Sequence, residues 1–88
     1  MYKIEFTKKF VRLYKNLDKK SCTLIDKAIA LLAKNPHHPS LRVKKIKGTK
    51  NIWEASAGMS IRITFELSEN VIQLRNVGTH DQVFRPPY

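Results

Sequence analysis

The spacing of the apolar residues changes twice along this chain, and these changes restrict the possible folds more than any other feature. Residues 2–6 alternate between apolar and polar side chains, which is typical of a half-buried strand. Between residues 7 and 34 the apolar residues recur every three or four positions, as in amphipathic helices. Residues 52–58, 60–67 and 71–78 return to the alternation of strands. The sequence therefore predicts one strand, a helical region and then several strands.

The helical region divides into two helices with recognisable ends. Thr7 and Asp18 each precede a run with helical spacing and can act as N-caps, with Ser21 as the alternative for the second helix. Pro36 ends that helix, because proline disfavours a helical conformation at the residue before it. Residues 37–51 are predicted to form a loop with a short edge strand. We expect an α+β fold in the order β-α-α-β-β-β(-β), a small antiparallel sheet with the helical hairpin packed on one face.

Charge and composition suggest the kind of partner. A chain of 88 residues suffices for one domain, which we expect to span residues 1–88. Its net charge of +10 predicts an anionic partner such as nucleic acid, an acidic protein or a charged surface, the alternative being solubility alone. The single cysteine, Cys22, excludes an intramolecular disulfide, and the sequence has no signal-peptide or membrane-span pattern. We expect a cytoplasmic protein that does not bind membranes.

The predicted strands carry cations on the face that points away from the helices. Arg62 alternates with the apolar residues of its strand, and Arg75 does the same in the last strand. The predicted edge strand adds Lys44 and Lys45, with Lys47 close behind. Each of these could be an ordinary solvated or paired side chain. Together they could bind phosphate, since guanidinium offers paired donors and lysine a mobile charge. We predict that Lys44, Lys45 and Arg75 bind substrate.

His80 follows the last strand and stands just behind Gly78. Histidine ordinarily titrates near neutrality and suits proton transfer, and beside phosphate-binding cations it fits RNA cleavage without a metal ion. A turn residue bonded to a backbone carbonyl is the alternative. Asp81 either orients His80 or caps a turn, and Phe84 either stacks on a base or closes the core. The histidines and Cys22 match no zinc spacing, so we expect neither metal nor organic cofactor.

Taken in order, these segments resemble the RelE/ParE superfamily of bacterial and archaeal toxins, and within it the RelE/YafQ-like mRNA interferases. The matching segments span nearly the whole chain: YKIEFTKKFVR with the helical hairpin after it, VKKIKGTKNIWEAS, IRITFEL and VGTHDQVF. They correspond to the opening strand, the "KG" segment, the "YRLVY" strand and the "TGTHxxLF" ending of that family. Each motif is short, and the specific part of the resemblance is their order.

The resemblance implies the toxin of a type II toxin–antitoxin system, a ribosome-dependent, metal-free endoribonuclease. Such a toxin enters the ribosomal A site and cuts translated mRNA by 2′-OH attack, and an acidic cognate antitoxin wraps and blocks it. By position, Arg62 would hold the scissile phosphate, His80 would be the general acid or base, Lys47 would stabilise charge or act as base, and Phe84 would place the substrate. These assignments make His80, Arg62 and Lys47 the predicted catalytic residues.

One departure from the family and two alternatives remain. The YafQ-like branch has further histidine and aspartate residues around its middle strands, where this chain has ASAGMS, and Glu54 or Asp81 could replace the missing base. A ParE-like toxin would share the fold, lack nuclease chemistry and inhibit DNA gyrase by binding. A non-catalytic RNA-binding or ribosome-binding domain would also explain the charge.

Overall fold

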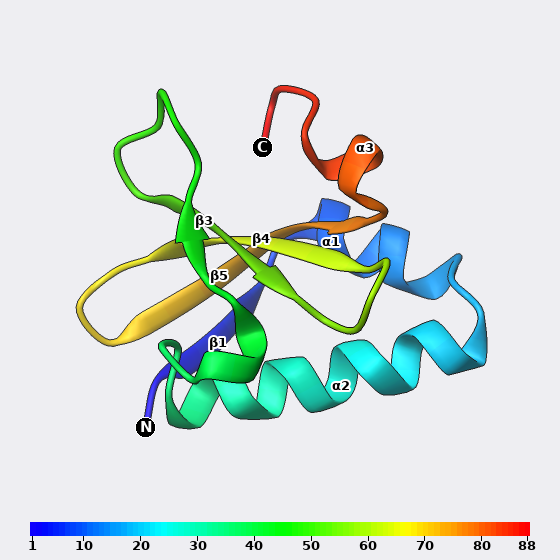
Figure 1. Ribbon diagram of the computed structural model, residues 1–88, viewed down its shortest axis with the longest axis horizontal. Coiled ribbons are helices and arrows are strands. Elements are labelled where there is room, and N and C mark those ends of the chain that lie inside the picture. The colour runs from blue at the N-terminus through cyan, green and yellow to red at the C-terminus, as the bar shows by residue number, and fades with distance from the viewer.

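The computed structural model describes all 88 residues and has an α+β fold with the predicted helical hairpin on one face of a sheet. The five strands are β1 (Lys3–Phe6), β2 (Lys44–Lys45), β3 (Ile52–Ser56), β4 (Arg62–Leu67) and β5 (Val71–Gly78). The helices are α1 (Lys8–Lys15), α2 (Lys19–Lys34) and α3 (His80–Val83), with a 3₁₀ turn over Pro39–Leu41. Figure 1 shows α2 on one side of the sheet and α3 with the C-terminus on the other. None of the helices is long and apolar enough to span a membrane.

The sheet is mixed, whereas the sequence suggested an antiparallel one. The strand order is β1-β5-β4-β3-β2, and all neighbours are antiparallel except β1 and β5. Those two run parallel, with Lys3 opposite Val71. Parallel neighbours need a long crossover connection, and the hairpin together with the β2–β4 meander supplies it. The expected short edge strand is confirmed as β2, at the opposite margin from β1.

Both helices of the hairpin begin at the predicted caps. The hydroxyl of Thr7 accepts a hydrogen bond from the backbone N–H of Phe10 at 3.1 Å, which starts α1. The carboxylate of Asp18 accepts from the backbone N–H of Ser21 at 3.1 Å and from its hydroxyl at 2.6 Å, which starts α2. Thr7 also donates to the carbonyl of Leu74 at 2.9 Å, and this bond ties α1 to β5.

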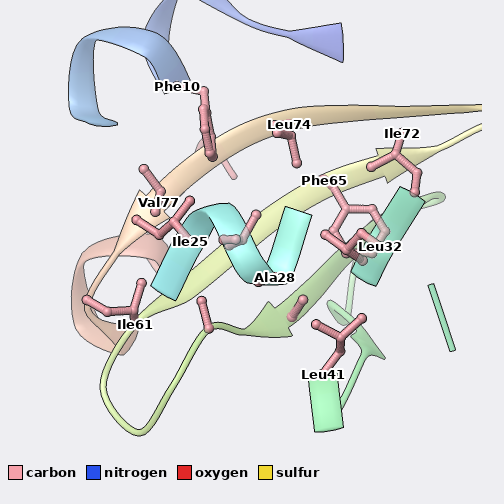
Figure 2. Close-up of a cluster of buried hydrophobic side chains, with 13 residues drawn as sticks. Phe10, Ile25, Ala28, Leu32, Leu41, Ile61, Phe65, Ile72, Leu74 and Val77 are labelled. Atoms are coloured by element: carbon pink, nitrogen blue, oxygen red, sulfur yellow. The ribbon is translucent and has the colours of Figure 1, made fainter. Parts of the chain in front are cut away.

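The main core lies between the hairpin and the sheet (Figure 2). It is a cluster of 13 buried apolar residues, Phe10, Ile25, Ala28, Leu32, Leu41, Ala55, Ala57, Ile61, Ile63, Phe65, Ile72, Leu74 and Val77. Tyr2 and Ile4 of β1 pack against its margin, as their alternation predicts. Phe6, which shares their predicted face, is 54% exposed at the end of this edge strand, although its ring lies 5.9 Å from that of Phe10 of α1, centroid to centroid.

The second face of the sheet is covered by the C-terminal segment, residues 79–88, whose sequence has neither a helical nor a strand period. Thr79 and Gln82 form a reciprocal capping box, with the side chain of each accepting from the backbone N–H of the other. The resulting helix α3 packs on β5 and β4 and buries Val83 completely. A Cβ at Gly78 would lie 2.5 Å from Gln82 Oε1, so a larger residue there would displace the side chain that completes the capping box. A helix of four residues is too short to show a helical period.

Candidate active site

The polar face of the sheet is organised in rows that cross the strands. One row joins four polar residues, Lys44 of β2, Glu54 of β3, Thr64 of β4 and Asn76 of β5. The next row joins Ser56, Arg62 and Gly78. Because residues two apart in a strand point to the same face, Arg62 lies one row away from this polar row, and His80 follows two residues after Gly78. The predicted cation and the predicted histidine therefore belong to the same face.

A pocket of about 320 Å³ at the β2 edge collects most of the predicted site residues. It is lined by Lys44, Lys45, Ile46, Lys47, Phe84 and Tyr88, and we refer to it as the basic-aromatic pocket. The rings of Phe84 and Tyr88 stand edge to face with centroids 6.4 Å apart. Three lysines thus face two aromatic rings from the C-terminal segment. The structure brings Lys44, Lys45, Lys47 and Phe84 together as expected, and it adds Tyr88, which no sequence motif indicates.

His80 is the first residue of α3 and lies beside this pocket. Its ring is 4.3 Å from the ring of Phe84, centroid to centroid, at an angle of 39°. Its Nδ1 atom is 3.6 Å from Oδ1 of Asp81, whose side chain is 94% exposed. That distance is too long for a hydrogen bond, so the contact with Phe84 orients the imidazole more directly. The His80 side chain remains 59% exposed and accessible to a ligand.

Arg62 lies in a separate pocket at the β3–β4 turn. This pocket, of about 330 Å³, is lined by Ser40, Arg42, Ser56, Gly58, Met59 and Arg62. The Nη1 atom of Arg62 donates to the carbonyl of Ile61 at 3.1 Å and lies 3.4 Å from the carbonyls of Gly58 and Met59. These contacts hold one end of the guanidinium group on its own turn. Arg62 therefore shares the face of the basic-aromatic pocket but does not line it.

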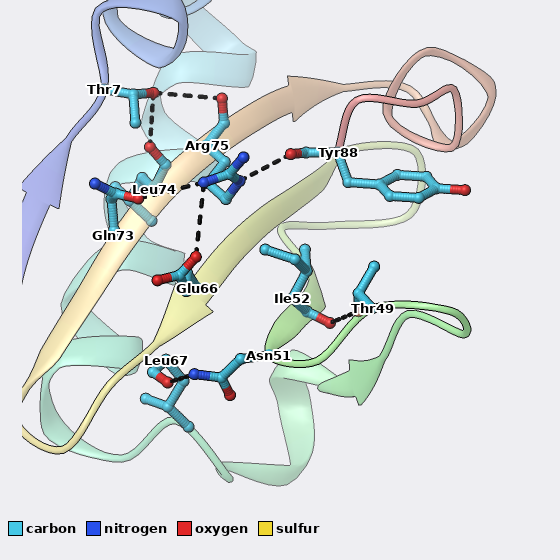
Figure 3. Close-up of polar contacts among 10 residues, drawn as sticks. All are labelled: Thr7, Thr49, Asn51, Ile52, Glu66, Leu67, Gln73, Leu74, Arg75 and Tyr88. Atoms are coloured by element: carbon cyan, nitrogen blue, oxygen red, sulfur yellow. Dashed lines mark hydrogen bonds and ion pairs between the residues drawn. The ribbon is translucent and has the colours of Figure 1, made fainter.

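Arg75 holds the C-terminus (Figure 3). Its Nε atom donates to the carbonyl of Tyr88 at 2.8 Å, and its Nη1 atom is 3.8 Å from Oε1 of Glu66 and 3.4 Å from Oε1 of Gln73. The register shift in β5 leaves Arg75 as the residue without a strand partner, a bulge that re-aims its side chain. Binding of substrate by Arg75 would therefore require a change in its contact with Tyr88.

Glu54 is the polar residue whose environment the sequence could not show. Its position in β3 places it on the polar face, yet it is only 3% exposed. Oε1 lies 3.9 Å from Nζ of Lys44, whereas Oε2 is buried without a hydrogen-bond partner. The hydroxyl of Thr64, directly opposite on β4, is also buried and unpartnered. Alternation along the strand places Glu54 on the correct face, but alternation alone cannot show that the side chain is buried there.

Comparison with known proteins gives one clear answer about the fold. No model of a known protein family and no curated protein matches the sequence. YafQ from E. coli strain BL21(DE3) superposes with a TM-score of 0.80 at 17% identity, over 97% of this chain and 100% of that one. RelE in the archaeal RelE–RelB complex of Pyrococcus horikoshii OT3 gives 0.74 at 19%, over 89% and 93%. YoeB in the Staphylococcus aureus YoeB dimer gives 0.75 at 18%, over 90% and 97%. The chain has the fold of these toxins.

Proposed function

We propose that this chain is the toxin of a type II toxin–antitoxin system and cleaves translated mRNA in the ribosomal A site. The observation that carries the proposal is the basic-aromatic pocket with the ring of His80 in contact with Phe84 of its aromatic wall. The fold shared with YafQ, RelE and YoeB supports it. A binding surface alone would need charge, but it would not need a titratable side chain held against a ring of that pocket.

Single-stranded RNA fits the chemistry of the pocket. Lys44, Lys45 and Lys47 are all exposed, and their ammonium groups can neutralise backbone phosphates. Phe84 and Tyr88 offer rings on which an unpaired base can stack, which is how proteins commonly hold single-stranded RNA. Duplex recognition would instead need an element that enters a groove. The pocket therefore favours a strand with splayed bases, such as mRNA presented on the ribosome.

The proposed reaction is attack of a ribose 2′-OH on the adjacent phosphate. A bond forms between the 2′-oxygen and phosphorus, the bond from phosphorus to the 5′-oxygen breaks, and the products are a 2′,3′-cyclic phosphate and a 5′-hydroxyl. Arg62 and Lys47 would stabilise the charge on the phosphate, and Lys44, Lys45 and Arg75 would hold the flanking strand. His80 would transfer a proton, and Phe84 would keep the substrate in line.

A translating extract provides the test. Wild type, His80→Ala and Arg62→Ala are added separately, and mRNA 5′ ends are mapped. We expect wild type to generate new ends within translated codons, and each variant to lose about 10²–10⁴-fold in cleavage rate, the usual worth of a proton-transfer or charge-stabilising group. His37→Ala is the matched control, because His37 is exposed and lies outside both pockets.

Two outcomes would contradict the nuclease. Translation could stop while the mRNA stays intact, which would indicate a non-catalytic ribosome-binding domain. Alternatively, both variants could cut as fast as wild type, which would remove the assigned residues from the chemistry. A parallel DNA supercoiling assay with gyrase separates the ParE-like alternative, for which inhibition without RNA cleavage is expected.

The proposed second partner is an acidic antitoxin. The net charge of +10 favours an acidic chain, and P. horikoshii RelE, which shares this fold, is in complex with RelB. An apolar pocket of about 500 Å³, lined by residues of β1, α1 and α2 that include the exposed Phe6 and Val11, offers an anchoring point for such a chain. Co-expression with the neighbouring small acidic reading frame should yield a stable complex and suppress toxicity. Failure of every neighbouring product to bind would count against this partner.

A further inference from the structure

The pocket at the β3–β4 turn holds two arginines and no acidic residue. We refer to it as the two-arginine pocket, and its walls are Ser40, Arg42, Ser56, Gly58, Met59 and Arg62. Arg42 is exposed, forms no ion pair and makes no side-chain hydrogen bond. Arg62 donates only through Nη1, to carbonyls of its own turn, so its other guanidinium nitrogens are free. Because no carboxylate neutralises these two cations, the pocket attracts an anion.

The backbone of Arg42 indicates that the fold alone does not explain an arginine there. With φ 48° and ψ 46°, it is the only residue other than glycine that has a positive φ. An arginine in this left-handed conformation is strained, whereas glycine and asparagine adopt it more readily. Strained backbone is found most often at sites that bind or react. The side chain of Arg42 therefore calls for a role other than stability.

The other walls of the two-arginine pocket suit a nucleotide. Ser40 and Ser56 supply hydroxyl groups, and the hydroxyl of Ser56 makes no hydrogen bond within the chain. Met59 is 98% exposed at the turn and offers an apolar side chain beside the cations. Guanidinium groups bind phosphate oxygens with paired donors, and exposed apolar side chains can contact unstacked bases. The volume of about 330 Å³ has room for a nucleotide, since ligand pockets range upward from about 300 Å³.

The two-arginine pocket continues the polar face beyond the basic-aromatic pocket. Ser56 and Arg62 lie opposite each other in one row of the sheet, and Lys44 of the basic-aromatic pocket belongs to the next row. Gly78 of β5 is the strand partner of Arg62, and His80 follows it two residues later. A strand of RNA that lies in the basic-aromatic pocket and passes His80 can therefore continue into the two-arginine pocket.

We propose that the two-arginine pocket is a second phosphate site, in which Arg42 binds the phosphate of the substrate RNA next to the one that is cut. The inference rests on the function proposed above. Arg62 would hold the cut phosphate, and because Arg42 lines the same pocket, the neighbouring phosphate of the strand reaches Arg42. The lysines of the basic-aromatic pocket hold the strand on one side of the cut and Arg42 holds it on the other. Arg42 thus positions the bond that breaks and takes no part in proton transfer.

The test measures binding of a short labelled single-stranded RNA by fluorescence anisotropy at several salt concentrations. A 2′-deoxyribose at the cut position, known from the mapped 5′ ends, keeps the RNA intact. Arg42→Gly removes the side chain, and we expect it to bind about tenfold more weakly than wild type, as for the loss of one charged hydrogen-bonding group. The slope of log Kd against log salt concentration should fall by about 0.7, the value for one phosphate of a single strand.

Stability and charge are separated with the same set of variants. Since glycine suits the left-handed backbone, Arg42→Gly should be at least as stable as wild type in thermal unfolding, so weaker binding cannot come from a weaker fold. If the glycine variant does not fold, Arg42→Asn replaces it, because asparagine also adopts this conformation. Arg42→Lys keeps the charge and loses the paired donors, so it should recover part of the affinity.

Neutral methylphosphonate linkages, placed at one position at a time, identify the phosphate that Arg42 binds. Wild type should lose about tenfold in affinity when one linkage beside the cut position is neutral, and Arg42→Gly should lose nothing further at that linkage. At the other linkages the two losses should add. Arg12→Ala is the matched control, because Arg12 is exposed on α1 and lines neither pocket. It should bind each RNA within about twofold of wild type.

Three results would overturn the inference while mRNA cleavage by wild type leaves the proposed function standing. Arg42→Gly could bind the RNA as tightly as wild type, and weaker binding to ribosomes without mRNA would then assign the pocket to ribosomal RNA. The two losses could add at every linkage, which would reduce Arg42 to general charge. The coupling could also fall on the cut linkage, so that Arg42 has no phosphate of its own. Conversely, coupling at one linkage in a wild type that cuts no mRNA would refute the nuclease and keep the phosphate site.

Discussion

Thr64 and Phe65 are neighbours in β4, both with no exposed surface, and they point to opposite faces of the sheet. Phe65 packs among apolar side chains beneath the helical hairpin. Thr64 lies beneath the C-terminal segment with its hydroxyl unpartnered, beside an equally unpartnered carboxylate oxygen of Glu54. The apolar face stabilises the fold, whereas the unpartnered polar groups buried on the other face lower its stability. Such a loss of stability is expected at a site that must receive a polar ligand.

The largest effect is expected on the stable face. Phe65→Ala removes a fully buried ring from the core cluster and leaves a cavity, so the free energy of unfolding should fall by about 3–5 kcal/mol. Urea denaturation followed by circular dichroism measures it. If the free energy of unfolding fell by less than 1 kcal/mol, packing of the hairpin on this face would contribute little to stability. The two faces would then not differ in their contribution to stability.

On the polar face, removal of a ring should affect binding and leave stability nearly unchanged. Tyr88→Ala takes one aromatic wall from the basic-aromatic pocket, and single-stranded RNA should bind more weakly by about 1–3 kcal/mol, the usual worth of one stacked base. Fluorescence anisotropy with a short labelled RNA measures it. Tyr88→Phe keeps the ring and serves as the control. Equal weakening by both variants would indicate that the hydroxyl, and not stacking, carries the contact.

A smaller effect of opposite sign is expected at Thr64. Thr64→Val keeps the shape of the side chain and removes the unpartnered hydroxyl, so the protein should gain about 1 kcal/mol of stability. The control is Ile63→Val, a conservative change on the other face, which should lower the stability by about 0.5–1.5 kcal/mol. Thermal unfolding of both variants shows whether their stability changes have opposite signs. A loss of stability in Thr64→Val would mean that the hydroxyl has a partner, such as a bound water molecule.

The smallest effect is expected in the helical hairpin, where the contribution of the Asp18 cap to stability should depend on pH. Hydrogen bonds from the side chain and backbone of Ser21 hold the pKa of Asp18 below its ordinary value of 3.8. Because the folded pKa is depressed, the contribution of the charged cap is present above 3.8 and is lost as the pH falls through the lower, folded value. The difference in stability between wild type and Asp18→Asn should therefore shrink as the solution is acidified below 3.8. A difference that stays constant with pH would show that the cap works without its charge.

Sequence periodicity predicted the elements that pack against their neighbours in the chain. The two helices, the caps at Thr7 and Asp18 and the edge strand β2 all follow from local spacing and local hydrogen bonds, and all are confirmed. The parallel pairing of β1 with β5 has no local signal, because it depends on residues nearly 70 positions apart, such as Lys3 and Val71. The direction of β1 could not be read from its own residues.

The candidate site shows the same limit. Charge clustering indicated Lys44, Lys45 and Lys47, and the structure places them in one pocket. No motif indicates Tyr88, because it reaches the pocket only after residues 79–88 fold back over the sheet. Glu54 was a candidate base in the sequence, but its burial, with 3% of the residue exposed, has no signal there. A short helix stabilised by its own capping box leaves no periodic trace, so the cover of the polar face is a tertiary feature.

The position of β5 in the middle of the sheet has a consequence for biosynthesis. Strand β1 leaves the ribosome first, but its only strand partner is β5, which is made last. A nascent chain can form the helical hairpin and the β2–β4 meander, yet these two parts remain unjoined until residues 71–78 arrive. The basic-aromatic pocket needs the residues beyond β5 as well. The pocket, and with it the activity proposed above, can therefore form only once the chain has left the ribosome that makes it.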